Sequence, residues 1–215
     1  MNMLTKMALG LIGQMRPDAP TGDSSPAVVL PPPQTQGGLP LMQALTLRHS
    51  ERSFDTAALP AQTLSDLLWA AAGINRPEHG GRTAPSAMNS QEVDVYVAVP
   101  EGLYLYDPQA HALQRVLAAD VRRVTGYQDF VDDAPLDLVY VADHARMKLV
   151  PAALRESYAS TAVGAMAQNV YLYCASAGLS TVIRAWIDRQ ALATAMGLGT
   201  DQQVMLAQTV GGTSP

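Results

Sequence analysis

Two arginines and a serine lie close together at Arg48, Ser50 and Arg52, in the stretch RHSERSFD that spans residues 48–55. The guanidinium group of arginine is a planar fork of hydrogen-bond donors that matches the oxygens of a phosphate, and a serine hydroxyl can bind the same oxygens. Arginine and serine also cluster on ordinary solvated surfaces. The stretch alone therefore predicts an anion-binding site without identifying the anion.

Two further segments follow this one along the chain. The second is RTAPSAMNSQ, residues 82–91, and the third combines AQN at 167–169, AGLSTVIRA at 177–185 and AQTVG at 207–211. Taken singly, the second would be an ordinary turn and the third an ordinary buried strand. In this order and spacing, the three segments resemble the FMN-dependent nitroreductase family, and the resemblance spans residues 40–212.

The resemblance implies a homodimer with FMN at the subunit interface. Arg48 and Ser50, with His49 between them, match positions that hold the FMN phosphate, and Arg52 matches a basic position near the ribityl chain and the pyrimidine edge. A cation there would stabilise the negative charge that reduction leaves on the flavin. Three residues match the loop that the partner subunit lays against the isoalloxazine, namely Pro85, Ser86 and Asn89.

The end of the third segment is expected at the reactive edge of the flavin. Ala185 and Trp186 match the place where a backbone N–H approaches flavin N5, and Arg184 is counted with the cofactor-binding residues. No catalytic side chain is expected, because the flavin carries the chemical step and the protein orients it. No glycine-rich dinucleotide fingerprint follows a predicted strand, which fits a NAD(P)H donor that visits the site.

The implied activity is transfer of hydride from NAD(P)H through flavin N5 to a small acceptor, such as a nitroaromatic or a quinone, in a ping-pong scheme. Two alternatives remain open: a flavin-dependent dehydrogenase of azoline-type or other substrates, and a non-catalytic module that binds or stores FMN. Tyr127 and Phe130 are candidates for contact with the acceptor, within a segment at 120–133 that is either mobile and near a substrate opening or a plain surface loop.

One departure from the family concerns the phosphate site. Many members carry basic residues near the C-terminus, whereas this chain has no lysine or arginine after Arg189. The resemblance then leaves Arg48, Arg52, hydroxyls and backbone amides to bind the phosphate.

Composition excludes several other classes of protein. The net charge of −5 and the pI of about 5.2 argue against a broad nucleic-acid-binding surface. Charged residues make up only 15% of the 215 residues, which favours burial of part of the surface in a homodimer. Cys174 is the only cysteine, expected as a buried thiol, and the four histidines lack metal-ligand spacing, so no metal site is expected. No apolar run is long enough to span a membrane.

The elements that must position the site indicate an α+β fold, in which helices flank a central, mainly antiparallel sheet. Helical periodicity predicts a first helix from Pro40, a second capped by Thr63 and ending at Gly73, and later helices at 157–177 and 190–196. Strands are expected at 93–99, 102–107, 136–142, 181–187 and 204–210.

The chain is expected to consist of an arm and one domain. Residues 1–39 are rich in proline and glycine and read as an extended arm, and residues 40–215 form the FMN-binding domain. The apolar run within residues 1–15 indicates a frayed amphipathic segment or a degraded export signal. We therefore expect a cytoplasmic protein, with a periplasmic or exported location as the alternative.

Overall fold

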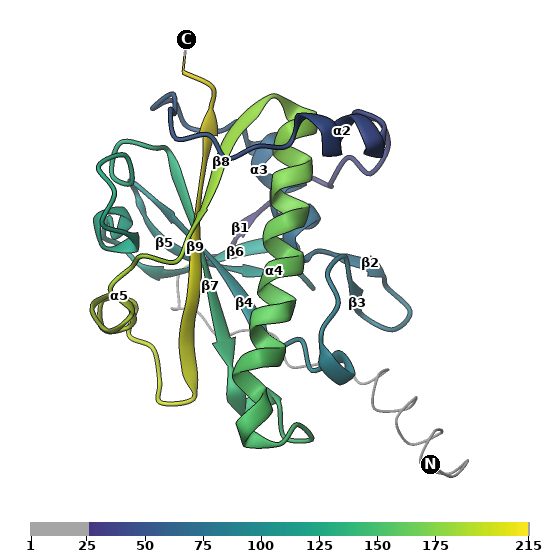
Figure 1. Ribbon diagram of the computed structural model, residues 1–215, viewed down its shortest axis with the longest axis vertical. Helices are drawn as coiled ribbons and strands as arrows, with labels where there is room; N and C mark the ends of the chain where they lie inside the picture. Colours follow the sequence, from purple (N-terminus) through teal and green to yellow (C-terminus); the bar gives the residue numbers. More distant parts are fainter. Residues whose placement is uncertain (1–25, 215) are drawn as a thin grey trace.

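A computed structural model describes residues 26–214, and a seven-stranded antiparallel sheet forms its centre (Figure 1). The strand order is β1-β6-β5-β4-β7-β9-β8, with every neighbouring pair antiparallel. The strands are β1 (Val28–Val29), β4 (Val93–Val99), β5 (Gly102–Asp107), β6 (Ala112–Leu117), β7 (Leu136–Asp143), β8 (Leu179–Arg184) and β9 (Gln202–Gly212). A separate hairpin pairs β2 (Ile74–Arg76) with β3 (Gly81–Arg82). The predicted fold class is confirmed.

Helices cover both faces of the sheet. They are α2 (Leu41–Leu47), α3 (Ala61–Ala72), α4 (Ala152–Ala177) and α5 (Arg189–Met196), with short 3-10 segments η1 (Ala87–Asn89), η2 (Arg122–Thr125) and η3 (His144–Arg146). Figure 1 shows α4 running along the sheet, with α2 beside its C-terminal end and the β2–β3 hairpin to the side of its lower half. Helix α2 and the β2–β3 hairpin therefore lie at different positions along α4.

Alternate residues of the central strands enter two separate apolar cores. Val93, Val95 and Val97 of β4 pack in the core beneath α3 and α4, whereas Tyr96 and Ala98 pack in the core on the α5 side. Successive side chains of a strand point to opposite faces, so each strand contributes to both cores. The sheet is therefore buried on both faces and forms a rigid base for the loops at its ends.

Two helices begin earlier than the periodicity indicates. The second helix starts at Ala61 after Pro60, so Thr63 lies inside the helix and is not its cap. The long helix starts at Ala152 after Pro151, five residues before the predicted start. Proline has a fixed φ suited to a helix start and no N–H to leave unpaired, so a proline begins each of these helices.

The strand predictions differ from the structure mainly at the ends. The strand expected at 181–187 covers Leu179–Arg184, because a turn follows in which the Ile187 N–H donates to the Ala185 carbonyl. The strand expected at 204–210 extends over Gln202–Gly212, because β9 is bonded by β7 on one side and by β8 on the other. Strand β6 was not predicted, although it pairs with β5 over most of its length.

The described part of the proline-rich arm packs on its own chain. Strand β1 pairs with β6, and Leu30 is buried. The carbonyl groups of Pro31 and Pro32 accept hydrogen bonds from Ser65 Oγ (2.6 Å) and Gln62 Nε2 (2.9 Å), both on α3. The packed structure thus begins before the expected boundary near Pro40, whereas the apolar run within residues 1–15 lies outside the described residues.

Candidate functional site

The arginine-rich stretch leaves the end of α2 and runs beside β8. The Arg48 N–H donates to the Ala44 carbonyl at the end of the helix, and the Glu51 N–H donates to the Thr181 carbonyl of β8 (3.0 Å). This bond holds the stretch against the strand that ends just before Ala185. The first and third predicted segments are therefore neighbours in the fold.

Tyr171 of α4 joins these two segments. Its hydroxyl lies 2.8 Å from Ser50 Oγ and accepts a hydrogen bond from the Ile183 N–H at 3.0 Å. The Arg48 guanidinium lies over the Tyr171 ring, 5.3 Å from its centroid, within cation–π range. Sequence reasoning missed Tyr171, because a tyrosine in an apolar helix looks like an ordinary core residue and carries no motif.

The charged groups of the stretch are available to a ligand to different degrees. His49, Ser50 and Arg52 are exposed, and Arg48 is half-buried. Glu51 Oε1 accepts from the backbone N–H groups of Arg52 (2.7 Å) and Ser53 (3.0 Å), and these bonds lower the pKa of the Glu51 carboxyl. Because Glu51 occupies these two N–H groups, side chains are the natural donors to an anion here.

A pocket of about 230 Å³ lies between this stretch, the C-terminal end of α4 and the start of β8. Its polar lining includes hydroxyl groups of Tyr171, Ser180 and Thr213. Thr213 follows β9, in the part of the chain where no basic residue occurs, and its hydroxyl donates to the Gly178 carbonyl (3.1 Å). Cys174 also lines the pocket, and its burial confirms the predicted buried thiol and raises the thiol pKa.

The second segment forms a strained loop around η1. Three non-glycine residues adopt left-handed backbone angles, Met88 (φ 54°), Asn89 (φ 53°) and Gln91 (φ 48°). Local hydrogen bonds support this conformation: the Gln91 N–H donates to Ser86 Oγ (3.0 Å) and Gln91 Nε2 donates to the Gly80 carbonyl (2.8 Å). Such strain persists only where the surroundings fix the backbone, and it is frequent at functional sites.

Charged side chains fix the far end of this loop. Arg146 Nη1 donates to the Gln91 carbonyl (2.9 Å), and the same guanidinium pairs with Asp94 and with Asp143. Burial raises the pKa of Asp94, while Arg146 and Arg82 act in the opposite direction. The sequence located this loop but gave no sign of its strain or of the charges behind it.

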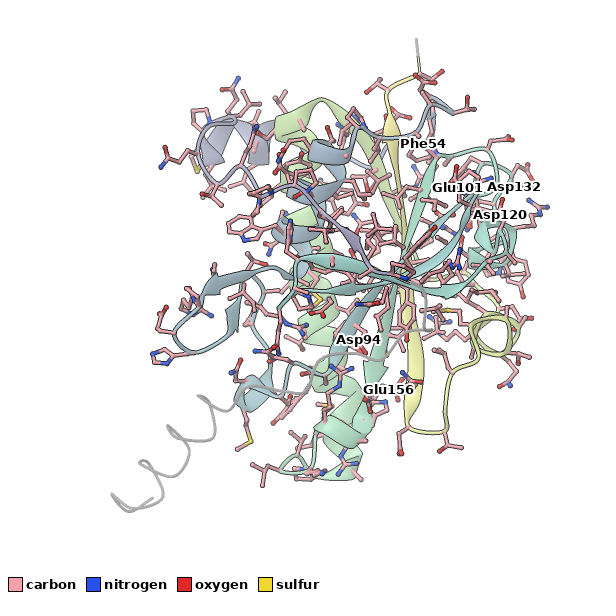
Figure 2. The ribbon with its side chains drawn as sticks, turned by 180° about the vertical axis from the view of Figure 1, so that it is seen from behind. Phe54, Asp94, Glu101, Asp120, Asp132 and Glu156 are labelled. Carbon is pink, nitrogen blue, oxygen red and sulfur yellow. The ribbon has the colours of Figure 1, made fainter. Side chains whose placement is uncertain are left out.

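The second segment lies apart from the arginine-rich stretch within one chain. In Figure 2, Phe54, which follows the arginine-rich stretch, lies near the top of the molecule. Asp94, which follows the strained loop, lies well below it in the same view. The loop itself contacts α4 through η1. One chain therefore carries the predicted cofactor contacts in two separate places, which are called the candidate half-sites below.

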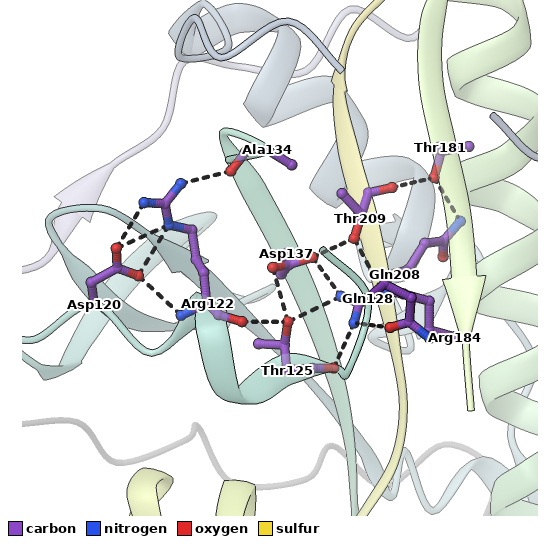
Figure 3. Close-up of polar contacts among 10 residues, drawn as sticks. All are labelled: Asp120, Arg122, Thr125, Gln128, Ala134, Asp137, Thr181, Arg184, Gln208 and Thr209. Atoms are coloured by element: carbon purple, nitrogen blue, oxygen red, sulfur yellow. Dashed lines mark hydrogen bonds and ion pairs between the residues drawn. The ribbon is translucent and has the colours of Figure 1, made fainter. Parts of the chain in front are cut away.

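The third segment ends in an exposed turn. Ala185 and Trp186 are exposed, and the Trp186 ring lies 5.4 Å from that of Tyr127, centroid to centroid. The Arg184 side chain instead enters the interior and pairs with Asp137 at 2.6 Å (Figure 3). The guanidinium of Arg184, predicted among the cofactor-binding residues, thus lies away from the surface, and only its backbone could meet a ligand.

The two aromatic residues expected near an acceptor point to different places. Tyr127 is 52% exposed and lies beside Trp186. Phe130 is half-buried and packs on Phe54, with a centroid distance of 5.4 Å. Tyr127 is therefore the more accessible of the two. The segment that carries them is hydrogen-bonded to the sheet through Thr125.

The chain is similar to proteins of one family. The family model named Nitroreductase family matches residues 45–212. A curated relative from Methanocaldococcus jannaschii, "Putative nitroreductase MJ1384", is 34% identical over 152 residues, which cover 66% of this chain and 76% of the relative.

Solved structures extend this similarity. A Ralstonia eutropha protein described as a "putative nitroreductase" has 52% sequence identity and a TM-score of 0.85, with 94% of this chain and 96% of that chain covered. A Desulfovibrio desulfuricans protein, described as a "putative nitroreductase in complex with FMN", shares the fold with a TM-score of 0.59 and 22% identity, covering 83% and 92% of the two chains. Among residues 26–214, every helix is too short or too polar to span a lipid bilayer.

Proposed function

The chain belongs to the nitroreductase family, and from this premise we propose that it is an FMN-dependent oxidoreductase that passes hydride from NAD(P)H to a small conjugated acceptor. One observation carries the proposal. The Tyr171 hydroxyl contacts Ser50, which belongs to the predicted phosphate-binding stretch, residues 48–52, here called the phosphate grip. The same hydroxyl accepts from the N–H of Ile183, which lies two residues before the predicted N5 contact at Ala185. One helix thus supports both ends of the proposed flavin site.

The donor set of this half-site fits a flavin phosphate. Arg48 and Arg52 supply guanidinium groups, and Ser50 adds an exposed hydroxyl. The hydroxyls of Ser180 and Thr213 line the neighbouring pocket, and the Thr213 hydroxyl would reach the phosphate by turning away from the Gly178 carbonyl. Charge-assisted hydrogen bonds from arginine to phosphate are among the stronger polar contacts, so two guanidinium groups can anchor the cofactor.

The exposed turn and the strained loop would enclose the flavin ring. When bound, FMN would supply the hydride chemistry, and the protein would bind, orient and shield it. The backbone at Ala185 and Trp186 is free to approach the ring, because both residues are exposed. The loop of Ser86 and Asn89, fixed by Arg146, would cover the ring of the flavin held by the partner subunit.

A homodimer would bring these two half-sites together. The short helix α2 leaves four apolar side chains exposed, namely Leu41 (63%), Met42 (72%), Leu45 (43%) and Leu47 (48%). A contiguous exposed apolar surface of this kind typically marks an interface. Because α2 leads directly into Arg48, an interface over α2 would place the partner's loop near the phosphate grip.

Flavin analysis of the purified full-length chain tests the proposal. We expect a yellow protein that releases FMN on denaturation, loses its flavin colour under anaerobic NADH or NADPH, and regains it when a quinone is added. A chain that binds no flavin, even after incubation with FMN, would contradict the proposal. Flavin that stays oxidised with both nucleotides would favour the dehydrogenase alternative if an azoline substrate reduces it. Inertness to every donor would favour FMN storage.

The dimer has its own test. Sedimentation should give twice the mass of one chain, and Met42→Glu should shift the protein toward monomer and lower its FMN content. A monomeric wild-type chain with full FMN content would contradict a shared site. Glu78, exposed on the β2–β3 connection, provides a control substitution to lysine away from α2.

A further inference from the structure

The side chain of Arg184 ties β8 to the adjacent strand β9, to β7 beyond it and to a loop. The Arg184 side chain is 3% exposed, and the side chain of its partner Asp137 on β7 is fully buried. Nε donates to Thr209 Oγ1 on β9 (3.1 Å), and Nη2 donates to Asp137 Oδ1 (2.6 Å). Burial raises the pKa of Asp137, and Arg184, with hydroxyls around the carboxylate, opposes this. The pair is a fully hydrogen-bonded buried ion pair (Figure 3).

The same guanidinium also binds Thr125, the last residue of η2. Nη1 donates to the Thr125 carbonyl (2.6 Å), and Nη2 donates to Thr125 Oγ1 (3.0 Å). Thr125 Oγ1 also donates to Asp137 Oδ2 at 2.9 Å. Thr125 is therefore bound by both members of the ion pair. Gly126 lies directly against Arg184, because a Cβ atom at this position would collide with Nη1.

A second arginine, Arg122, joins the two ends of the segment formed by residues 120–134. Arg122 pairs with Asp120 at 2.7 Å, and its Nη1 donates to the Ala134 carbonyl, also at 2.7 Å. Residues near both ends of the segment are thus joined by one guanidinium, and Arg184 anchors its middle. These contacts fix the backbone on either side of Tyr127.

An exposed aromatic ring follows each of the two residues, Arg184 and Thr125, that these hydrogen bonds join. Trp186, two residues after Arg184, is 70% exposed, and Tyr127, two residues after Thr125, is 52% exposed. Their rings are 5.4 Å apart and inclined by 45°. Large aromatic side chains are normally buried, so a fixed and exposed pair offers an apolar surface to a flat ligand.

We propose that Arg184 is a positioning residue that, with Asp137, locks residues 122–128 to the end of β8 and so fixes Tyr127 and Trp186 as a binding platform for a planar, conjugated electron acceptor. The inference rests on the proposed function for the identity of the ligand. A platform fixed in advance loses less conformational entropy when the ligand binds. Arginine suits this role because its planar fork bonds several acceptors at once, which a lysine ammonium cannot reproduce in the same geometry.

Three variants weaken the contacts of Arg184 and Asp137 with residues 122–128, here called the lock. They are compared with a control variant that lowers only the overall stability. Arg184→Lys keeps the charge but cannot reach all the oxygens. Asp137→Leu combined with Arg184→Met removes both charges, because removing one alone would leave the other buried without a partner. Gly126→Ala disturbs the lock from the loop side with no change of charge. Leu138→Ala is the control, because Leu138 is a neighbour of Asp137 but packs in the core beneath α4.

The rate of trypsin cleavage after Arg123 measures how firmly residues 122–128 are held. Arg123 is exposed, and cleavage after it requires the segment to open locally. We expect cleavage after Arg123 to be roughly tenfold faster in the lock variants than in the wild type, before other sites are cut. Leu138→Ala should instead show cleavage at many sites together. Equal resistance after Arg123 in all three lock variants and the wild type would overturn the lock.

The KM for an electron acceptor tests whether Tyr127 and Trp186 form a binding platform. With menadione as the acceptor, the lock variants and Trp186→Leu should raise the acceptor KM by about two- to tenfold, the range of one aromatic contact. The FMN content of each variant is measured beside the KM, so that a KM raised by loss of cofactor is distinguished from one raised by loss of the aromatic contact. An unchanged KM for menadione in Trp186→Leu would overturn the platform. If the wild type binds no flavin, the proposed function fails, and the trypsin result still decides whether Arg184 locks the segment.

Discussion

The hydroxyl of Tyr171 lies 2.8 Å from Ser50 Oγ, a contact between residues separated by 121 positions in the chain. The same hydroxyl accepts from the Ile183 N–H. The segments that contain Ser50 and Ile183 both carry candidate cofactor contacts. One atom on α4, the Tyr171 hydroxyl oxygen, therefore fixes the position of both. The geometry of the half-site depends on a residue that itself has no charge.

Replacing Tyr171 with phenylalanine should damage both stability and flavin binding. The change leaves the Ile183 N–H without its partner and frees Ser50, so we expect the unfolding free energy to fall by about 1–2 kcal/mol. FMN affinity should fall as well, measured by quenching of flavin fluorescence. Tyr173→Phe on the same helix is the control, because its hydroxyl makes only a long bond to the Thr63 carbonyl (3.3 Å). Equal effects of the two changes would contradict the role of Tyr171.

Removing the guanidinium of Arg48 should lower FMN occupancy. A charge-assisted bond to phosphate contributes about 1.5–3 kcal/mol, so Arg48→Ala should weaken FMN binding by roughly 10- to 150-fold. Equilibrium dialysis of the apoprotein with FMN measures this loss. Riboflavin, which lacks the phosphate, should bind wild type and variant equally. Full FMN retention in Arg48→Ala would place the phosphate elsewhere.

Substitutions at Met88 should reveal the strain in the loop. Met88 has φ 54°, and its side chain is only partly buried, so packing contributes little to the choice of residue. Glycine tolerates this backbone, whereas a β-branched residue does not. We expect Met88→Gly to stay within about 1 kcal/mol of wild type and Met88→Val to lose about 1–3 kcal/mol in urea unfolding. Equal stability of the two variants would show that the loop relaxes without cost.

Much of the fold was predictable because it follows local patterns. The alternation of valines in β4 and the hairpin turn to β5 are signals within a few residues, and both strands match the prediction. Strand β6 has the weaker pattern ALQRVL, in which charged and apolar residues mix, because it pairs with the short β1 near the sheet edge. Its position depends on long-range pairing that no local window contains.

The candidate site shows the same limit at the level of side chains. Motif spacing predicted the Arg48 stretch and the backbone at Ala185 as cofactor contacts, but not that Tyr171 joins the two segments. The spacing also could not show that Arg184 turns inward, because an arginine on a strand suits either a ligand or a buried carboxylate. Only the fold brings Asp137 to the same face of the sheet. The direction of a charged side chain is thus decided by partners distant in sequence.

His111 should make the packing of the arm sensitive to pH. Its Nδ1 lies 2.9 Å from the Tyr106 hydroxyl, and its Nε2 lies 2.7 Å from Ser65 Oγ and 3.1 Å from the Pro31 carbonyl. Burial lowers the pKa of His111 below its ordinary value of 6.5, while the Pro31 carbonyl and Asp66 oppose the shift. The folded chain therefore binds the proton less readily than the unfolded chain.

The sign of the effect follows from this difference. Stability should be highest above about pH 6.5 and should fall as the pH drops from there toward the lowered pKa of the folded state. Urea unfolding between pH 7.5 and 5 measures the loss, and hydrogen exchange at the Leu30 amide, which donates to the His111 carbonyl, reports opening of the arm. His111→Asn is the matched variant, because asparagine accepts the left-handed φ of 48° and does not titrate in this range. It should show a smaller fall in stability with acidification, and the same fall in both proteins would assign the effect to another group.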